Sequence, residues 1–244
     1  MIFKKIFEIG LNDISKGNFI TNKAIIKNLE NIGANHSDQV GYGVLDIPNT
    51  NASWVVLDWK IEIIKRPIYG QKLNIHTWAR TTKRAYTYRD YIIYDEQGNK
   101  MVIATSRWAL ISLDNGRPVK LDNSIIDRFE PEEDKKVFGF EELEKLKEPS
   151  SFQNIIYYKV NRSDIDINKH MHNLYYLDLA YEVLPQDVYE TITFDKIRIT
   201  YKKEIKLGDV VKSKYTYEGD KHIITICDEN ESIIHSIIEL EEFR

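Results

Sequence analysis

The chain is predicted to be an α+β protein built from two tandem copies of one unit, an antiparallel sheet wrapped around a central helix. Three observations predict this. The order strand, helix and several long strands occurs twice in the 244 residues. A charged stretch without an apolar face separates the two copies, and the segment 61–70 lines up with 199–208. A small curled sheet leaves an open edge, and two copies pairing edge to edge would cover it.

The first copy opens with an expected strand over 3–9 and a helix for which Thr21 is the expected N-cap. Apolar residues recur at helical spacing from Ile25 to Val40, and the Gly41–Gly43 segment ends the pattern. Strands are expected over 54–64, 73–81, 86–94 and 101–113, with a hairpin turn at 95–99. In the first of these strands, four apolar residues alternate with three charged ones, as in a half-buried strand: Leu57, Trp59, Ile61 and Ile63 against Asp58, Lys60 and Glu62.

The second copy repeats the order. A strand is expected over 155–160, then a helix with Leu174, Leu177, Tyr181 and Leu184 on one stripe that stops at Pro185. Further strands are expected over 191–203, 209–218, 221–228 and 232–240. The charged residues between the copies predict a linker with at most a short solvated helix. The predicted domains are therefore 1–130 and 151–244, joined by a linker over 131–150.

The amino-acid composition argues against several classes of protein. With 42% apolar and 11% aromatic residues the chain can bury a sizeable core. A net charge of −4 argues against a nucleic-acid protein. The single cysteine, Cys227, excludes an intramolecular disulfide and a cysteine-rich metal site. No apolar run is long enough to span a membrane, and the N-terminus enters a strand at once, which predicts a cytoplasmic protein without a targeting peptide.

Three basic pairs could serve an acidic partner: Lys65–Arg66, Lys83–Arg84 and Lys202–Lys203. The alternative is that they are solvated strand ends.

The most informative stretch is the segment 164–176, where a carboxylate, a carboxamide and an imidazole stand at alternate positions before a helical pattern. On extended backbone Asp166, Asn168 and His170 would share one face. The helix that follows brings unpaired N–H groups and the positive end of its dipole to the same place. A base, an orienting amide and a site for developing negative charge suit chemistry on a carbonyl, with His170 as the general base.

Each of these residues also has a structural interpretation. Asn168 could be the N-cap of the helix, and Asp166 could be a turn carboxylate. Asp164 and His172 are weaker candidates. Glu204 is a further catalytic candidate; its alternative is an ordinary exposed glutamate at a solvated strand end.

Metal and cofactor chemistry find no support in the sequence. His170 and His172 lie two apart, and the chain offers neither a Cys/His cluster nor a His-x-x-x-His pair on a helix. Neither a glycine-rich phosphate loop nor a Gly-x-Ser-x-Gly motif occurs. We therefore expect an enzyme with no metal and no cofactor.

The segment 164–173, Asp-Ile-Asp-Ile-Asn-Lys-His-Met-His-Asn, resembles the Asp-Leu-Asp-x-Asn-x-His-x-Asn-Asn block of the acyl-acyl carrier protein thioesterases of plant plastids and bacteria, departing from it at His172. Ile-Thr-Tyr-Lys-Lys-Glu at 199–204 is similar to that family's Leu-Glu-Tyr-Arg-Arg-Glu segment. Segments 7–10, 53–56 and 106–108 also resemble family landmarks, so the resemblance covers nearly the whole chain. It implies two tandem hotdog domains.

The resemblance further implies hydrolysis of the fatty acyl-acyl carrier protein thioester, with release of a free fatty acid (EC 3.1.2.14). It carries over Asp166, Asn168, His170 and Glu204 as catalytic residues. The first domain would hold the acyl chain, with substrate-binding residues expected at Trp54, Trp59 and Trp108. The implied partner is the acyl carrier protein, a homodimer is left open, and the implied location is a bacterial cytoplasm.

One departure matters for mechanism. Many plant members have a cysteine just after the matching glutamate, whereas this chain has Ile205, so a Cys-His-Asn mechanism is impossible here and attack by water is expected. The alternatives are an acyl-CoA thioesterase, a dehydratase of the same fold, and a non-catalytic protein that binds acyl chains.

Overall fold

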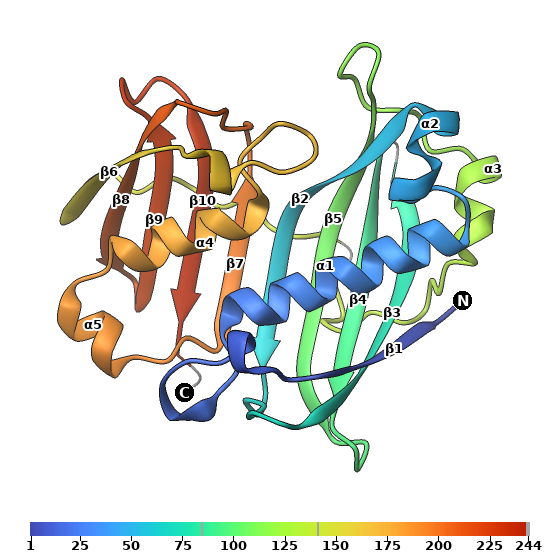
Figure 1. Ribbon diagram of the computed structural model, residues 1–244, viewed down its shortest axis with the longest axis horizontal. Coiled ribbons are helices and arrows are strands. Elements are labelled where there is room, and N and C mark those ends of the chain that lie inside the picture. Colours follow the sequence, from blue (N-terminus) through green and yellow to red (C-terminus); the bar gives the residue numbers. More distant parts are fainter. Residues whose placement is uncertain (84, 141, 243–244) are drawn as a thin grey trace. The chain divides into compact units, whose positions relative to one another are not determined.

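The computed structural model describes residues 1–83, 85–140 and 142–242, and it divides into two compact units, Met1–Leu143 and Glu144–Arg244. Each unit contains one antiparallel sheet and one long central helix (Figure 1). The predicted α+β class with two sheet-and-helix copies is therefore confirmed.

In the first unit the strands lie in the spatial order β1 (Phe3–Glu8), β3 (Lys72–Lys83), β4 (Tyr86–Tyr94), β5 (Lys100–Ser112) and β2 (Ala52–Ile63). All neighbouring pairs are antiparallel. The central helix α1 (Asn22–Gln39) runs across this sheet, and two short helices follow in the chain, α2 (Ile47–Thr50) and α3 (Asn123–Ile126).

The start and end of α1 follow from local chemistry. Thr21 is the N-cap, and its Oγ1 accepts a hydrogen bond of 3.0 Å from the Ala24 amide, as predicted. Ile25, Leu29 and Ile32 are almost fully buried. Beyond the helix, Gly41 adopts a φ of +78°, a conformation that suits glycine at a helix end.

One expected alternation is wrong in detail. In β2 a β-bulge falls between Val56 and Asp58, so Leu57 is only half-buried and Asp58 is buried at 2% exposure. The extra residue of a bulge reverses which face the preceding side chains occupy. From Trp59 onward the apolar residues are inward, as expected.

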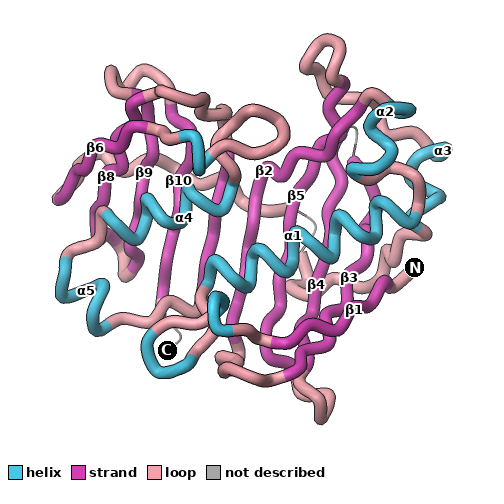
Figure 2. The backbone as a smooth tube through the Cα atoms, in the orientation of Figure 1, coloured by secondary structure: helices cyan, strands magenta, loops and turns pink. Residues whose placement is uncertain are grey.

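The second unit has the strand order β7 (Lys196–Tyr201), β10 (Ile234–Glu241), β9 (Lys221–Asp228), β8 (Val210–Glu218) and β6 (Asn154–Lys159). Its central helix α4 (Asn173–Glu182) packs on β8, β9 and β10, and α5 (Gln186–Thr191) follows it (Figure 2). The segment 191–195, expected as the start of a strand, instead belongs to the end of α5 and a loop.

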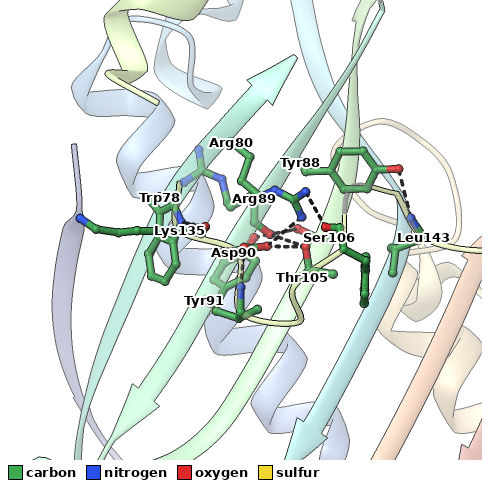
Figure 3. A network of polar contacts seen from close by, with 12 residues as sticks. Trp78, Arg80, Tyr88, Arg89, Asp90, Tyr91, Thr105, Ser106, Lys135 and Leu143 are labelled. Atoms are coloured by element: carbon green, nitrogen blue, oxygen red, sulfur yellow. Dashed lines mark hydrogen bonds and ion pairs between the residues drawn. The ribbon is translucent and has the colours of Figure 1, made fainter. Parts of the chain in front are cut away.

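The segment between the two sheets is a packed strap rather than a solvated spacer. Residues 131–140 and 142–150 contain no helix, so the short helix that the sequence left open does not form there. Three hydrogen bonds attach the strap to the first sheet. Trp78 Nε1 donates to the Lys135 carbonyl (2.9 Å; Figure 3). The Val137 amide donates to Asp90 Oδ2 (3.1 Å), and Arg80 Nη2 donates to the Phe140 carbonyl (2.9 Å). Further along, Leu146 is buried against Ile223 and Ile237 of the second unit.

Candidate active site

The stretch that carries Asp166, Asn168 and His170 is a compact turn, not the extended lead-in that its alternating pattern suggested. The Asp166 amide donates to the His170 carbonyl (2.8 Å), and the Lys169 amide donates to the Asp166 carbonyl (3.0 Å). Lys169 has a φ of +64°, which lets the chain reverse. The residues are therefore gathered by a turn rather than by sharing one face of extended backbone.

The Asp166 carboxylate stabilises this turn. Its Oδ1 accepts hydrogen bonds from the amides of Asn168 (2.8 Å) and His170 (3.3 Å). Aspartate favours such turns because its short side chain reaches the backbone two residues on. The interpretation of Asp166 as a turn carboxylate is thus confirmed, and its second oxygen has no hydrogen-bond partner in the described part of the chain.

Helix α4 begins later than Asn168. His172 is its N-cap, with Nδ1 accepting from the Leu174 amide (3.2 Å), so the interpretation of Asn168 as N-cap is wrong. The Asn168 side chain is exposed. Within the described residues the Asn173 amide, at the first helical position, donates no hydrogen bond to the protein, which leaves it free to bind an oxygen with developing negative charge.

Asp164 stabilises the loop before α4 with hydrogen bonds to its buried side chain. It is 3% exposed, and its Oδ2 accepts from the Tyr158 hydroxyl and from the Asn161 amide, each at 2.7 Å. Because this carboxylate already accepts hydrogen bonds from the protein, a structural role for Asp164 is supported.

Glu204 reaches the same place from the segment after β7. His170 forms an isolated antiparallel bridge with Lys206, and the Met171 amide donates to the Ile205 carbonyl (2.8 Å). The buried His235 ring lies 3.1 Å from the Lys203 carbonyl and holds the residue before Glu204. Two segments distant in the sequence thus meet beside the start of α4.

The electrostatics of the cluster show that these groups are neighbours. Partial burial acts to raise the pKa of Glu204, but its own backbone amide, the Lys203 ammonium at 3.3 Å and the charge of His170 outweigh this and lower the pKa. The carboxylate is therefore ionised at neutral pH. No hydrogen bond joins the His170 ring to Glu204 or Asp166 among the described residues.

Tyr176, on the first turns of α4, was not singled out from the sequence. It is 3% exposed, and burial raises the pKa of its phenol, as do the charges of Glu204 and Asp166. The Ile205 backbone opposes this rise in pKa, so the phenol lies beside the turn that carries Glu204. A tyrosine at helical spacing looks like an ordinary core residue, and only the fold shows this position.

The three tryptophans fall in different places within the first unit. Trp54 and Trp108 line a cavity of about 780 Å³, including space open to solvent, between α1 and the sheet. Trp59 does not line it: this ring is fully buried, with its centroid 6.3 Å from that of Trp108. Tyr42 and Phe129 contribute further aromatic wall.

Among the described residues, no group of three or more His, Cys, Asp or Glu side chains is placed to hold a metal ion. No helix in those same residues has the length and hydropathy needed to cross a bilayer. Of the basic pairs, Arg84 and the side chain of Lys83 lie outside the described part.

Sequence comparison gives a family for both units. The model of the acyl-ACP thioesterase N-terminal domain matches residues 1–129, and that of the acyl-ACP thioesterase C-terminal domain matches residues 147–239. An oleoyl-acyl carrier protein thioesterase of Arabidopsis thaliana is 28% identical over 230 residues, covering 88% of this chain. This chain spans only about 63% of the length of that relative.

Solved structures agree on the fold. An acyl-ACP thioesterase from Bacteroides thetaiotaomicron superposes with a TM-score of 0.86 at 22% identity, covering 98% of this chain and 97% of the other. The 12:0-ACP thioesterase of Umbellularia californica gives 0.83 at 20% identity, covering 98% and 96%. At these identities the structures establish the hotdog fold of both units. With family models matched over most of its length, the chain belongs to the acyl-ACP thioesterase family.

Proposed function

We propose that this protein hydrolyses the thioester between a fatty acyl chain and acyl carrier protein, releasing the free fatty acid. The observation that carries the proposal is the meeting of Asp166, His170 and Glu204 beside the start of α4, in the unit that matches the family's C-terminal domain. The named relatives act on acyl-carrier-protein thioesters, which supports the same substrate class here.

In the proposed mechanism a water molecule bound to the ionised Glu204 attacks the thioester carbonyl carbon. Its proton passes to Glu204 or to the His170 ring, general-base catalysis of a kind worth roughly 10²–10⁴-fold in rate. The carbonyl oxygen becomes negative and is stabilised by the Asn173 amide at the positive end of α4. The carbon–sulfur bond then breaks, and the departing thiolate takes up the proton.

No cysteine nucleophile takes part in this scheme. Ile205 is fully buried, and its carbonyl is engaged by the Met171 amide. Asp166 holds the turn that positions His170, and Asn168 contributes an exposed amide that can orient the substrate or the water.

We also propose a division of labour between the two domains. The N-terminal domain would accept the acyl chain in the cavity lined by Trp54 and Trp108, and the C-terminal domain would supply the hydrolytic residues. A cavity with mostly apolar and aromatic walls suits a hydrocarbon chain.

The test measures free thiol released from matched acyl-carrier-protein and acyl-CoA substrates over a panel of chain lengths. We expect release from the carrier-linked substrates with the higher kcat/KM. A preference for acyl-CoA would make the protein an acyl-CoA thioesterase, and double-bond formation from hydroxyacyl substrates without thiol release would make it a dehydratase. Absence of turnover together with co-purified lipid would replace the proposal with an acyl-chain binding protein.

A further inference from the structure

The cavity of the first unit contains a buried cation that the proposed hydrolysis does not use. Arg89, on β4, lines this cavity and is only 7% exposed. It packs beneath α1, where a Cβ placed on Gly33 would lie 3.5 Å from Arg89 Cδ. This is an ordinary van der Waals distance, so the arginine side chain packs directly against this part of the helix beside the cavity.

Within the described part of the chain, the partners of this guanidinium are neutral groups. Its Nη1 contacts His36 Nδ1 at 2.8 Å and Thr77 Oγ1 at 3.3 Å, and its carbon Cζ lies 5.7 Å from the centre of the Phe129 ring. Burial and the charge of Arg89 lower the pKa of His36 to about 3, so that ring is uncharged at neutral pH. Among the described residues, Arg89 has no carboxylate within ion-pair distance and no partner for its remaining N–H groups.

Two other arginines of the same sheet, the buried Arg80 and the half-buried Arg107, are paired with carboxylates. Arg80 lies 3.6 Å from Asp90, and Arg107 lies 2.5 Å from Asp58. Burying a charge is costly unless it is paired and hydrogen-bonded. Arg89 thus differs from these two arginines in having no carboxylate partner among the described residues, and it lines a cavity that a ligand can enter.

The fold itself does not require a cation at this position. In the first sheet Arg89 pairs with Ala79, and the equivalent pairing in the second sheet joins His222 to Tyr217. A hydrogen bond of 2.9 Å joins His222 Nδ1 to the Tyr215 hydroxyl, and burial lowers the pKa of His222. The second copy therefore fills the same place with a neutral, partnered ring.

We propose that Arg89 hydrogen-bonds an oxygen atom on the acyl chain, so that the preferred substrates are hydroxyacyl or ketoacyl chains rather than plain hydrocarbon chains. This rests on the proposed thioester hydrolysis. Trp54, Ile47 and Phe129 would contact the hydrocarbon part, and the guanidinium would donate to the oxygen. A neutral oxygen fits better than a carboxylate, because the cavity walls are mostly apolar and a carboxylate would have to give up its hydration there.

A site that binds a substrate oxygen penalises the analogue without it, because the buried donor is then left unpaired. Discrimination should therefore appear in kcat/KM between chains of equal length. The experiment compares thioesters of twelve-carbon chains. One chain is unsubstituted, a second set carries a hydroxyl or a keto group at each of a series of positions, and the last carries a carboxylate at its end.

We expect the wild-type protein to favour at least one hydroxy or keto isomer over the plain chain by about 10-fold or more in kcat/KM. Arg89→Met should abolish this preference and raise kcat/KM for the plain chain. The matched control, Arg107→Met, removes a half-buried guanidinium that does not line the cavity and should keep the preference. A wild-type preference for the plain or the carboxylated chain would overturn the inference, as would equal losses on all substrates in Arg89→Met.

A second measurement separates failure of this inference from failure of the proposed hydrolysis. Binding of free hydroxydodecanoate, measured by calorimetry, does not depend on turnover, and it should be about 10-fold tighter for wild type than for Arg89→Met. Equal binding to both proteins would overturn the inference even if no thioester is hydrolysed.

Thermal unfolding tests whether the variants are folded. Arg89→Met should melt at or above the wild-type temperature, whereas Arg107→Met, which removes the arginine beside Asp58, should melt at a lower temperature.

Discussion

The loop before α1 and the loop before α4 have the same backbone design. In the first, the Asp13 carboxylate accepts from the amide three residues earlier (3.0 Å), and its carbonyl accepts from Thr21 (2.9 Å). In the second, Asp164 accepts from the amide three residues earlier (2.7 Å), and its carbonyl accepts from His172 (2.8 Å). Each loop thus uses one aspartate to close itself just before the helix N-cap.

The contacts to the neighbouring turn also correspond. The Ile20 amide donates to the Pro67 carbonyl at 3.0 Å, and the Met171 amide donates to the Ile205 carbonyl at 2.8 Å. Against this common frame, four pairs of side chains differ: Ser15 and Asp166, Gly17 and Asn168, Phe19 and His170, Arg66 and Glu204. The two copies therefore share the architecture, and only the second has the acid, amide and imidazole groups that chemistry needs.

Arg66 shows what the first copy does instead. Its Nη1 donates to the Ile20 carbonyl (2.8 Å) and to Asn22 Oδ1 (2.9 Å), so it fastens the start of α1. Glu204, at the corresponding place, has a cationic neighbour in Lys203 and an imidazole nearby. One position thus stabilises a helix in the first unit, whereas in the second it carries the carboxylate that we propose acts in hydrolysis.

The largest expected effect comes from exchanging the imidazole. His170→Ala should lower kcat by roughly 10²–10⁴-fold, because the proposed general base is lost. The matched change, Phe19→Ala, alters the corresponding side chain of the first loop and should leave kcat within about 2-fold, since this aromatic ring has no acid–base chemistry. Thiol release under saturating substrate measures both, and similar losses in the two variants would contradict the asymmetry of the loops.

A pH profile sharpens the comparison at Glu204. Since the Lys203 ammonium helps to lower the pKa of this carboxyl, Lys203→Ala should raise that pKa. If activity needs the ionised carboxylate, it is lost as the pH falls through the pKa, so the acid limb of the kcat/KM profile should move to higher pH. Lys65→Ala, the equivalent change in the first copy, should leave the profile in place. An unmoved limb in Lys203→Ala would show that Glu204 does not set it.

Removing either helix cap should lower stability, but only the cap of α4 should also affect turnover. Thr21→Ala removes the hydrogen bond to the Ala24 amide and should lower the free energy of unfolding by about 1 kcal/mol. His172→Ala removes the equivalent bond to the Leu174 amide and should also lower stability. Denaturant unfolding measures both, and only His172→Ala should affect turnover, because α4 and not α1 begins beside the reacting groups. Loss of turnover in Thr21→Ala beyond its loss of folded protein would argue against this assignment.

The smallest expected effect is that of a restored thiol. Ile205→Cys places sulfur where many plant members carry it, but the proposed water attack does not use that position. Its kcat should therefore stay within about 3-fold of wild type, and iodoacetamide should not inactivate the variant faster than the parent protein. A large gain in kcat that iodoacetamide abolishes would favour a cysteine mechanism.

The architecture could be predicted because its signals are local and periodic. Alternating strands and the Thr21 cap depend on neighbours in the sequence, and their positions are confirmed within a few residues. The turn at Asp166 could not be predicted from alternation, since an aspartate that bonds to backbone amides competes with the extended conformation. The cap at His172 was also missed, because histidine is not among the preferred N-cap residues.

Features that depend on distant partners were beyond sequence reasoning. The bulge at Leu57 gives no sequence signal that distinguishes it from a regular strand, and the burial of Trp59 away from the cavity was not foreseen. Arg89 is one of 34 lysines and arginines in the sequence. That it has no carboxylate partner among the described residues appears only when α1 and β3 are packed against it. The roles of Asp166, Asn168, His170 and Glu204 stay predictions.

The strap over residues 131–140 sets a practical limit on dissecting this protein. Asp90 is fully buried, and burial raises its pKa; among the groups that oppose this are Thr105, Arg80 and the Val137 amide, which the strap provides (Figure 3). A fragment truncated near residue 130 would leave that carboxylate short of a donor, and the Trp78 indole would lose its acceptor. An expression boundary for the N-terminal half therefore belongs after Leu143, beyond the last residue that the first sheet holds.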